Sequence, residues 1–261
     1  MAKRSFCIVL AILILALSGL ILFEACSTPS LKSEDKAAII DQLYILQPNQ
    51  DFIRQITQAL SNYGFTVDVY RGEEVTVDFY RNLPTYGYKL IIFRVHSGLL
   101  GVDPKVVNKT WLFTAEPYSK TRYVAEQLTD QLTYAKTSDD APWVFAISAK
   151  FVTESMENRF NNTAIVMMGC DCLHFQDLAQ AFIQKGASTY IAWDVSVLLD
   201  YVDDTTVTLI EKLCSEEITI REAVAQTMKE KGPDPKHGAV LKYYPAESRD
   251  KTIGELLLSP L

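Results

Sequence analysis

Basic charge is scarce in this sequence. Its 25 Lys and Arg residues are outnumbered by 32 Asp and Glu residues, which gives a net charge of -7. Sequence-independent binding to nucleic acid needs a basic face, so the composition argues against nucleic acid as a partner. Internal repeats and low-complexity segments are also missing, which argues against solenoid and disordered classes.

Paired cysteines are missing as well. Of the five cysteines, Cys7 and Cys26 lie in or beside an apolar run at the N-terminus. The other three, Cys170, Cys172 and Cys214, are an odd number and do not form a disulfide framework. Because no CxxC pair is accompanied by a second pair of ligands, we expect no structural zinc site. The sequence therefore predicts no metal, no cofactor and at least one free thiol.

The one long apolar run stands at the N-terminus. Residues 7–23 are uncharged and follow Lys3 and Arg4, and their length is at the lower limit for crossing a bilayer. The positive-inside rule places the short N-terminus in the cytoplasm. We interpret residues 1–37 as an uncleaved signal anchor with a polar tether, and thus expect a membrane-anchored protein with an extracytoplasmic folded domain. A secreted form or a lipoprotein acylated at Cys26, after signal cleavage, is the alternative.

Strand-like and helical patterns alternate in residues 38–261. Apolar runs predict strands at 38–46, 65–70, 88–95, 164–168 and 188–194, and helical spacing predicts helices at 51–64, 74–87, 173–187, 200–216 and 218–232. Such alternation with short links predicts a three-layer α/β/α sandwich with a mostly parallel sheet. Residues 99–162 are less regular and indicate an insertion or a peripheral sheet.

Two reactive side chains fall at the ends of predicted core strands. His96, one of only three histidines, follows YKLIIFRV, and Cys170 follows AIVMMG. Ligand sites in parallel sheets form beyond the carboxyl ends of the strands. A nucleophilic cysteine needs a base or an imidazolium partner, and N–H donors for the oxyanion. Gly98 and Gly169 leave room for a substrate carbonyl, so this pattern predicts a dyad of His96 and Cys170.

The order of these motifs resembles the caspase-like cysteine peptidases, which include caspases, metacaspases, gingipains, separases and CHAT domains. The likeness is strongest to CHAT-type sequences, in which a strand ending in cysteine is followed by a helix, KGA and a strand ending in a Trp-containing turn. The matching segments here read AIVMMGCDCL, DLAQAFIQKGASTYIAWDVSV, DDTTVTLIEKL and ITIREAVAQTM. The resemblance covers residues 38–98 and 162–230 and implies a caspase-like fold.

The resemblance also implies catalytic roles. His96 would be the general base or imidazolium partner, and Cys170 the nucleophile that forms a thioester acyl-enzyme. The backbone N–H of Cys170, which follows Gly169, and an N–H near Ser97–Gly98 would form the oxyanion hole. The family usually has glycine directly after the histidine, whereas this chain has Ser97 there.

The resemblance further implies a substrate pocket at the next strand end. Asp194 follows Trp193 there, and a carboxylate at this place would favour Arg or Lys in a polypeptide substrate. Asp171, beside the nucleophile, would contribute the same charge. For both aspartates, a helix cap or a solvated loop is the alternative interpretation.

Three functions are compatible with the sequence. The first is a membrane-tethered cysteine endopeptidase. The second is a catalytically inactive domain of the same fold that serves as a binding or scaffold module. The third is a redox or metal-binding protein built on Cys170, Cys172 and His174, although their CxCxH spacing is not a standard ligand pattern.

Overall fold

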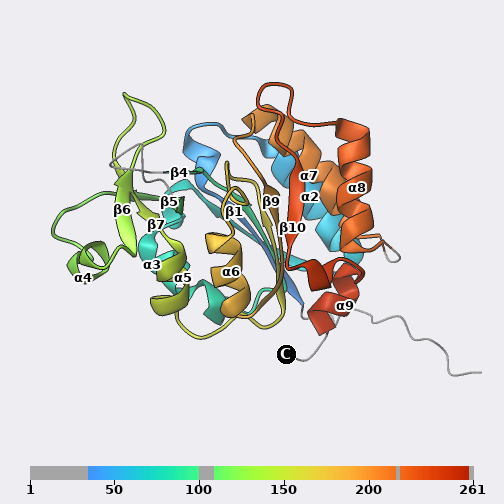
Figure 1. Cartoon of the computed structure of the whole chain (residues 1–261), viewed down its shortest axis with the longest axis horizontal. Helices are drawn as coiled ribbons and strands as arrows, with labels where there is room; N and C mark the ends of the chain where they lie inside the picture. The colour runs from blue at the N-terminus through green and yellow to red at the C-terminus, as the bar shows by residue number, and fades with distance from the viewer. Residues whose placement is uncertain (1–34, 100–108, 216–217, 259–261) are drawn as a thin grey trace, which may run out of the picture. The chain divides into compact units, whose positions relative to one another are not determined.

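A six-stranded, mostly parallel sheet forms the centre of the folded part of the protein (Figure 1). The computed structural model describes residues 35–99, 109–215 and 218–258. The strands are β1 (Lys36–Asp41), β2 (Thr66–Arg71), β3 (Leu90–Arg94), β8 (Thr163–Met167), β9 (Ala187–Trp193) and β10 (Leu241–Tyr244). They lie in the order β10-β9-β8-β3-β1-β2, and β10 is antiparallel to β9 while the other pairings are parallel.

Helices cover both faces of this sheet. They are α2 (Gln50–Tyr63), α3 (Val77–Asn82), α5 (Ala149–Glu154), α6 (Asp177–Gln184), α7 (Leu199–Leu213), α8 (Ile220–Lys231) and α9 (Ile253–Leu258). Because side chains alternate along a strand, Ile91 and Phe93 join the core under α3, α5 and α6. Leu90 and Ile92 join the core under α2, α7, α8 and α9. The predicted three-layer α/β/α sandwich is thus confirmed (Figure 1).

A second, antiparallel sheet lies where the sequence indicated an insertion or a peripheral sheet. Its strands are β4 (Ser97–Leu99), β5 (Thr110–Pro117), β6 (Leu132–Ala135) and β7 (Val144–Ile147), in the order β4-β5-β7-β6. The short helix α4 (Val124–Leu128) joins β5 to β6. The sheet begins directly after His96, so it borders the edge at which the predicted dyad lies.

Two predicted boundaries are wrong. β1 ends at Asp41 rather than at residue 46, and a 3₁₀ turn, η1 (Gln42–Ile45), follows it. Ile45 and Leu46 are 59% and 54% exposed, so the end of this apolar run is not core. The helix predicted at 51–64 is α2, which begins at Gln50 and is capped by Asn49, whose side chain accepts a hydrogen bond from the Phe52 N–H.

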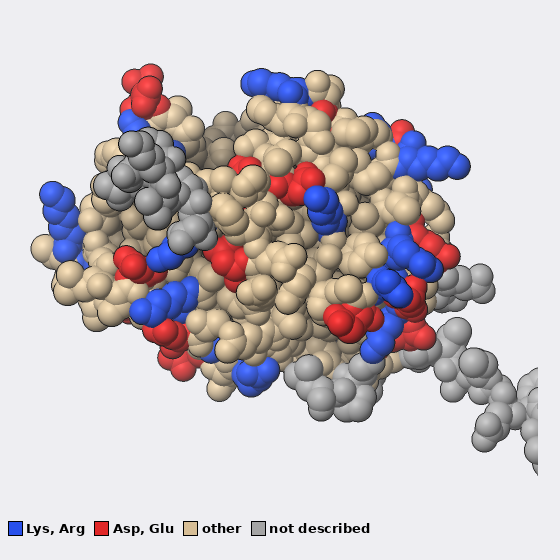
Figure 2. Space-filling model, in the orientation of Figure 1, with Lys and Arg blue, Asp and Glu red and all other residues tan. Residues whose placement is uncertain are grey.

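The predicted membrane anchor lies outside the described residues. The structure does not describe residues 1–34, which contain the apolar run. Within the described ranges, no helix is long and apolar enough to cross a membrane. On the face drawn in Figure 2, acidic and basic side chains intermingle among wide uncharged areas. That face therefore carries no broad patch of one sign.

A buried arginine joins three elements of the sandwich. Arg94, at the end of β3, donates from Nε and Nη2 to the two carboxylate oxygens of Asp203 on α7, each over 2.8 Å. Its Nη1 donates to Asp41 at the end of β1 over 2.7 Å, and Nη2 also donates to the Gln47 carbonyl over 2.9 Å. The side chains of Arg94 and Asp41 are fully buried, and that of Asp203 is nearly so. The guanidinium is tolerated at this buried position because it forms ion pairs with both carboxylates, those of Asp41 and Asp203.

We expect Arg94→Met to destabilise the protein by about 3–5 kcal/mol, because it leaves Asp41 and Asp203 buried without a cation. Urea unfolding followed by circular dichroism measures the loss. The matched control is Arg54→Met, which breaks an exposed ion pair with Asp51 and should cost less than about 1 kcal/mol. Equal losses in the two variants would contradict the role given to Arg94.

Candidate active site

The strand order determines where a ligand site forms. After β1 the chain adds β2 on one side and β3 on the other, so the topology reverses between β1 and β3. In open α/β sheets, ligands bind outside the carboxyl ends of the strands at such a switch point. His96 lies just beyond the end of β3 and is therefore at this place.

The register brings His96 and Cys170 to the same level. Strands β3 and β8 are parallel neighbours in which Phe93 lies opposite Met167. Each predicted dyad residue follows its strand partner by three positions (93 to 96 and 167 to 170). The two loops also touch, because the Ser97 hydroxyl donates a 2.6 Å hydrogen bond to the Cys170 carbonyl. The sequence-predicted residues thus come from adjacent strand ends.

His96 is half-buried and neutral at pH 7. Its backbone N–H donates to Gln42 Oε1 over 2.9 Å, and its carbonyl accepts from the Phe113 N–H over 2.9 Å. Its ring lies 6.0 Å from the Phe113 ring, centroid to centroid. Burial and the neighbouring positive charge of Arg94 lower the pKa of His96 to about 4. A neutral imidazole of this kind can accept a proton.

The Cys170 thiol is bonded to the loop that follows β9. It donates to the Val197 carbonyl over 3.6 Å and accepts from the Val197 N–H over 3.5 Å. Burial raises the pKa of this thiol in spite of the Val197 N–H, and the nearby Asp171 carboxylate adds to the effect. Within the described residues, no hydrogen bond joins the His96 ring to the thiol. The resting pair is therefore a thiol and a neutral imidazole.

Ser97, the residue after His96, connects the two loops. It is buried, and its hydroxyl also accepts a 3.1 Å hydrogen bond from the fully buried Cys172 thiol. A Cβ added at Gly169 would lie 2.2 Å from Ser97 Oγ, so Gly169 leaves the room that the serine fills. By contrast, a Cβ at Gly98 would meet no described atom within 4 Å. The open backbone near the predicted oxyanion hole is therefore at Gly98.

The predicted substrate residues have different surroundings. Trp193 is fully buried in the core under α7, where it packs against Tyr201. Asp194 accepts from the Val240 N–H over 2.9 Å and pairs with Lys242 over 2.9 Å. Burial raises the pKa of Asp194, but these two partners outweigh it and hold the pKa below its ordinary value. The charge of Asp194 is thus already balanced.

Asp171 is the less engaged of the two carboxylates. It is only partly buried and has a left-handed backbone, with φ of 58°. One of its carboxylate oxygens accepts a 2.8 Å hydrogen bond from the Ser196 hydroxyl. Ser196 precedes Val197, so the loop that contacts the thiol also contacts this carboxylate. The Asp171 carboxylate therefore has a neutral hydrogen-bond partner and follows Cys170 directly in the chain.

Gln42 and Arg94 are site residues that the sequence reasoning missed. Arg94 left a signal, since an arginine inside the apolar run KLIIFRV must find buried partners. Gln42 left none, because the run around it was assigned to a strand. The alternative interpretation paired Cys170 with Cys172. In the structure, the Cys170 thiol donates a hydrogen bond to the Val197 carbonyl, and the Cys172 thiol donates one to the Ser97 hydroxyl.

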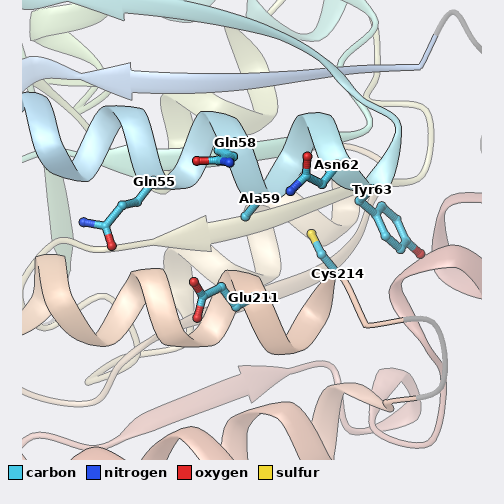
Figure 3. A pocket seen from close by; sticks show the side chains of 7 residues that line it. All are labelled: Gln55, Gln58, Ala59, Asn62, Tyr63, Glu211 and Cys214. Carbon is cyan, nitrogen blue, oxygen red and sulfur yellow. The ribbon is translucent and has the colours of Figure 1, made fainter.

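A hollow of about 590 Å³ lies elsewhere, between α2 and α7 (Figure 3). Three side-chain amides, Gln55, Gln58 and Asn62, line it from α2, and Glu211 and Cys214 line it from α7. These residues lie in the middle and C-terminal parts of their helices, which run back from the carboxyl edge of the sheet. Burial raises the pKa of Cys214 to about 12, so this thiol is unreactive. We therefore place the chemistry at the strand ends.

Comparison with known proteins does not assign this chain to a family. No protein-family model matches this chain, and no curated protein sequence matches it either. Among the described side chains, no group of three His, Cys, Asp or Glu residues is placed to hold a metal ion. The interpretation of the site therefore depends on its geometry.

We expect Gly169→Ala to be destabilising, because its Cβ would overlap Ser97 Oγ and Cβ. Ser97→Gly in the same chain removes both overlapping atoms and should restore part of the loss. Thermal unfolding of the two single variants and the double variant gives the coupling between the sites. Simple addition of the two losses would contradict the contact.

We expect a pH-dependent contribution of His96 to stability. Its folded pKa of about 4 lies below the ordinary 6.5, so the unfolded chain binds this proton first. The stability of the wild type should thus fall, relative to His96→Gln, as the pH drops from about 6.5 to about 4. Free energies of unfolding measured over this range test the expectation, and parallel curves would contradict it.

Proposed function

We propose that this protein is a cysteine peptidase with Cys170 as nucleophile and His96 as general base. The observation that supports this most directly is that each residue lies three positions beyond a paired residue of two adjacent parallel strands, Phe93 and Met167, and that the Ser97–Cys170 hydrogen bond joins the segments that follow. The caspase-like order of motifs in the sequence supports the same roles. The apolar residues 7–23 would hold the enzyme at a membrane, with the folded domain outside the cytoplasm.

The proposed reaction begins with proton transfer. As the Cys170 sulfur attacks the substrate carbonyl carbon, the thiol proton passes to His96 and the carbonyl electron pair moves onto oxygen. The backbone N–H of Cys170 would stabilise this oxyanion. The C–N bond then breaks, His96 returns the proton to the leaving amine, and a thioester remains. Water activated by His96 hydrolyses the thioester.

The resting geometry adds a requirement to this mechanism. The thiol contacts Val197 and not the His96 ring, and burial favours the neutral form of both groups. The Cys170 side chain must therefore turn toward His96 when a substrate binds. We infer that the enzyme does not store a thiolate–imidazolium pair and that proton transfer accompanies the attack.

We assign the preference for a basic substrate residue to Asp171. Asp194 is balanced by Lys242, whereas Asp171 has a neutral partner in Ser196 and lies next to the nucleophile. A carboxylate in this place favours Arg or Lys through a charge-assisted hydrogen bond. The acidic group and the reactive thiol would then contact neighbouring atoms of one substrate residue.

A catalytically inactive binding domain is the second candidate. The raised pKa of the Cys170 thiol and its hydrogen bonds to Val197 favour this function, because both make the thiol a weak nucleophile. A protein of this kind would bind the same polypeptide at the strand ends and release it unchanged. Covalent labelling by a substrate-like probe separates the two functions.

We expect a peptidyl acyloxymethyl ketone with arginine next to the warhead to label Cys170. The same probe with aspartate there should react at least about tenfold more slowly, since it loses the contact with Asp171. Intact-mass spectrometry and peptide mapping identify the modified cysteine. Cys170→Ala should abolish labelling, and His96→Ala should slow it by about 100-fold or more.

The matched control for this experiment is Cys214→Ala, which removes another partly buried thiol and should leave the labelling rate unchanged. Labelling of Cys170 at the rate of a free thiol, with no effect of His96→Ala, would exclude the peptidase and favour the binding domain. Hydrolysis of a fluorogenic arginyl peptide by the wild type, lost in Cys170→Ala, tests turnover.

A further inference from the structure

The side chain of Gln42, which follows β1, forms a hydrogen bond with the main chain of His96, which follows β3. Gln42 is 5% exposed, and its Oε1 accepts the hydrogen bond from the His96 N–H over 2.9 Å. Its Nε2 donates to the Thr114 carbonyl on β5 over 3.4 Å. The Phe113 N–H on the same strand donates to the His96 carbonyl over 2.9 Å. The Gln42 amide therefore joins the ends of β1 and β3 to β5.

The position of Gln42 is itself fixed. The preceding residue, Asp41, lies opposite Arg94 in the β1–β3 register, and their side chains form the buried 2.7 Å ion pair. Arg94 precedes His96 by two positions and is also paired with Asp203. The buried charge of Arg94 thus links both the residue before Gln42 and the strand that precedes His96.

We propose that Gln42 is a positioning residue, whose side-chain amide fixes the main chain of His96 and so directs the imidazole toward Cys170. The inference rests on the proposed function, because the direction of the ring matters only where His96 takes a proton from the thiol. A general base must lie within hydrogen-bond reach of the proton that it removes. An error of about 1 Å in such a group can cost about 100-fold in rate.

The charged groups around this strand end come from four elements. They are Arg94 on β3, Asp41 on β1, Asp203 on α7 and Arg71, which lies opposite Asp41 at the end of β2, and β5 contributes the uncharged ring of Phe113. The carboxylates of Asp41 and Asp203 are both paired with Arg94. A new negative charge at position 42 would act on His96, and Arg71 is the cation that would offset part of it.

The first test is Gln42→Glu in the full-length protein, followed by NMR titration of ¹⁵N-labelled histidine rings. The acceptor oxygen remains while a negative charge is added beside His96, so the pKa of His96 should rise by about one pH unit. The chain has only three histidines, and the exposed His174 and His237 serve as internal references that should not move. An unchanged His96 titration would overturn the inference.

The second test is Gln42→Leu, assayed on the fluorogenic arginyl peptide. This variant loses both hydrogen bonds, so kcat should fall by about 10- to 100-fold while KM stays within about threefold. Gln55→Leu, on the exposed face of α2, is the matched control and should keep wild-type kinetics. Equal kcat values for Gln42→Leu and the wild type would overturn the inference.

The two proposals fail in different ways. A wild type that neither cleaves the peptide nor reacts with the arginyl probe overturns the proposed function and, with it, the catalytic role of Gln42. A wild type that cleaves the peptide, with Gln42→Leu lowering only the unfolding temperature and Gln42→Glu leaving the His96 titration unchanged, overturns the positioning role alone.

Discussion

The buried charge of Arg94 is the constraint on which the site edge depends. A guanidinium in the core is tolerated only if carboxylates come to it, and here Asp41 arrives from β1 and Asp203 from α7. Bringing these groups together sets the level at which β1 ends. It also holds β3 two residues before His96. An apolar residue in place of Arg94 would leave both carboxylates buried without a cation and would not specify where these elements meet.

The sequence predicted the features that depend on local pattern. Apolar runs and helical spacing predicted the central strands and the main helices, and they correctly placed His96 and Cys170 just after two of these strands, β3 and β8. Long-range partners decided the rest. Residues 43–46 are as apolar as a strand, yet the chain turns after Asp41, which pairs with Arg94, and Ile45 becomes exposed. The strand order of the second sheet depends on pairings that no local pattern encodes.

Ser97 and Gly169 illustrate how two neighbouring positions share space. The serine side chain occupies volume that a glycine would leave empty, and Gly169 opposite it supplies that volume. The hydroxyl then joins the Cys170 carbonyl to the Cys172 thiol. One residue later, at Gly98, the backbone is uncrowded, since an added Cβ would meet no described atom within 4 Å.

The same burial that orders the site also favours its neutral form. Low dielectric surroundings disfavour charge, so they lower the pKa of His96 and raise that of Cys170. Both shifts keep the proton on sulfur. In the proposed peptidase, the site could not rely on a standing thiolate, and the proton would have to move from sulfur to the imidazole during the attack. The hydrogen bond from the His96 N–H to Gln42 matters for this reason. A weakly basic imidazole is effective only if it is already held where the proton leaves.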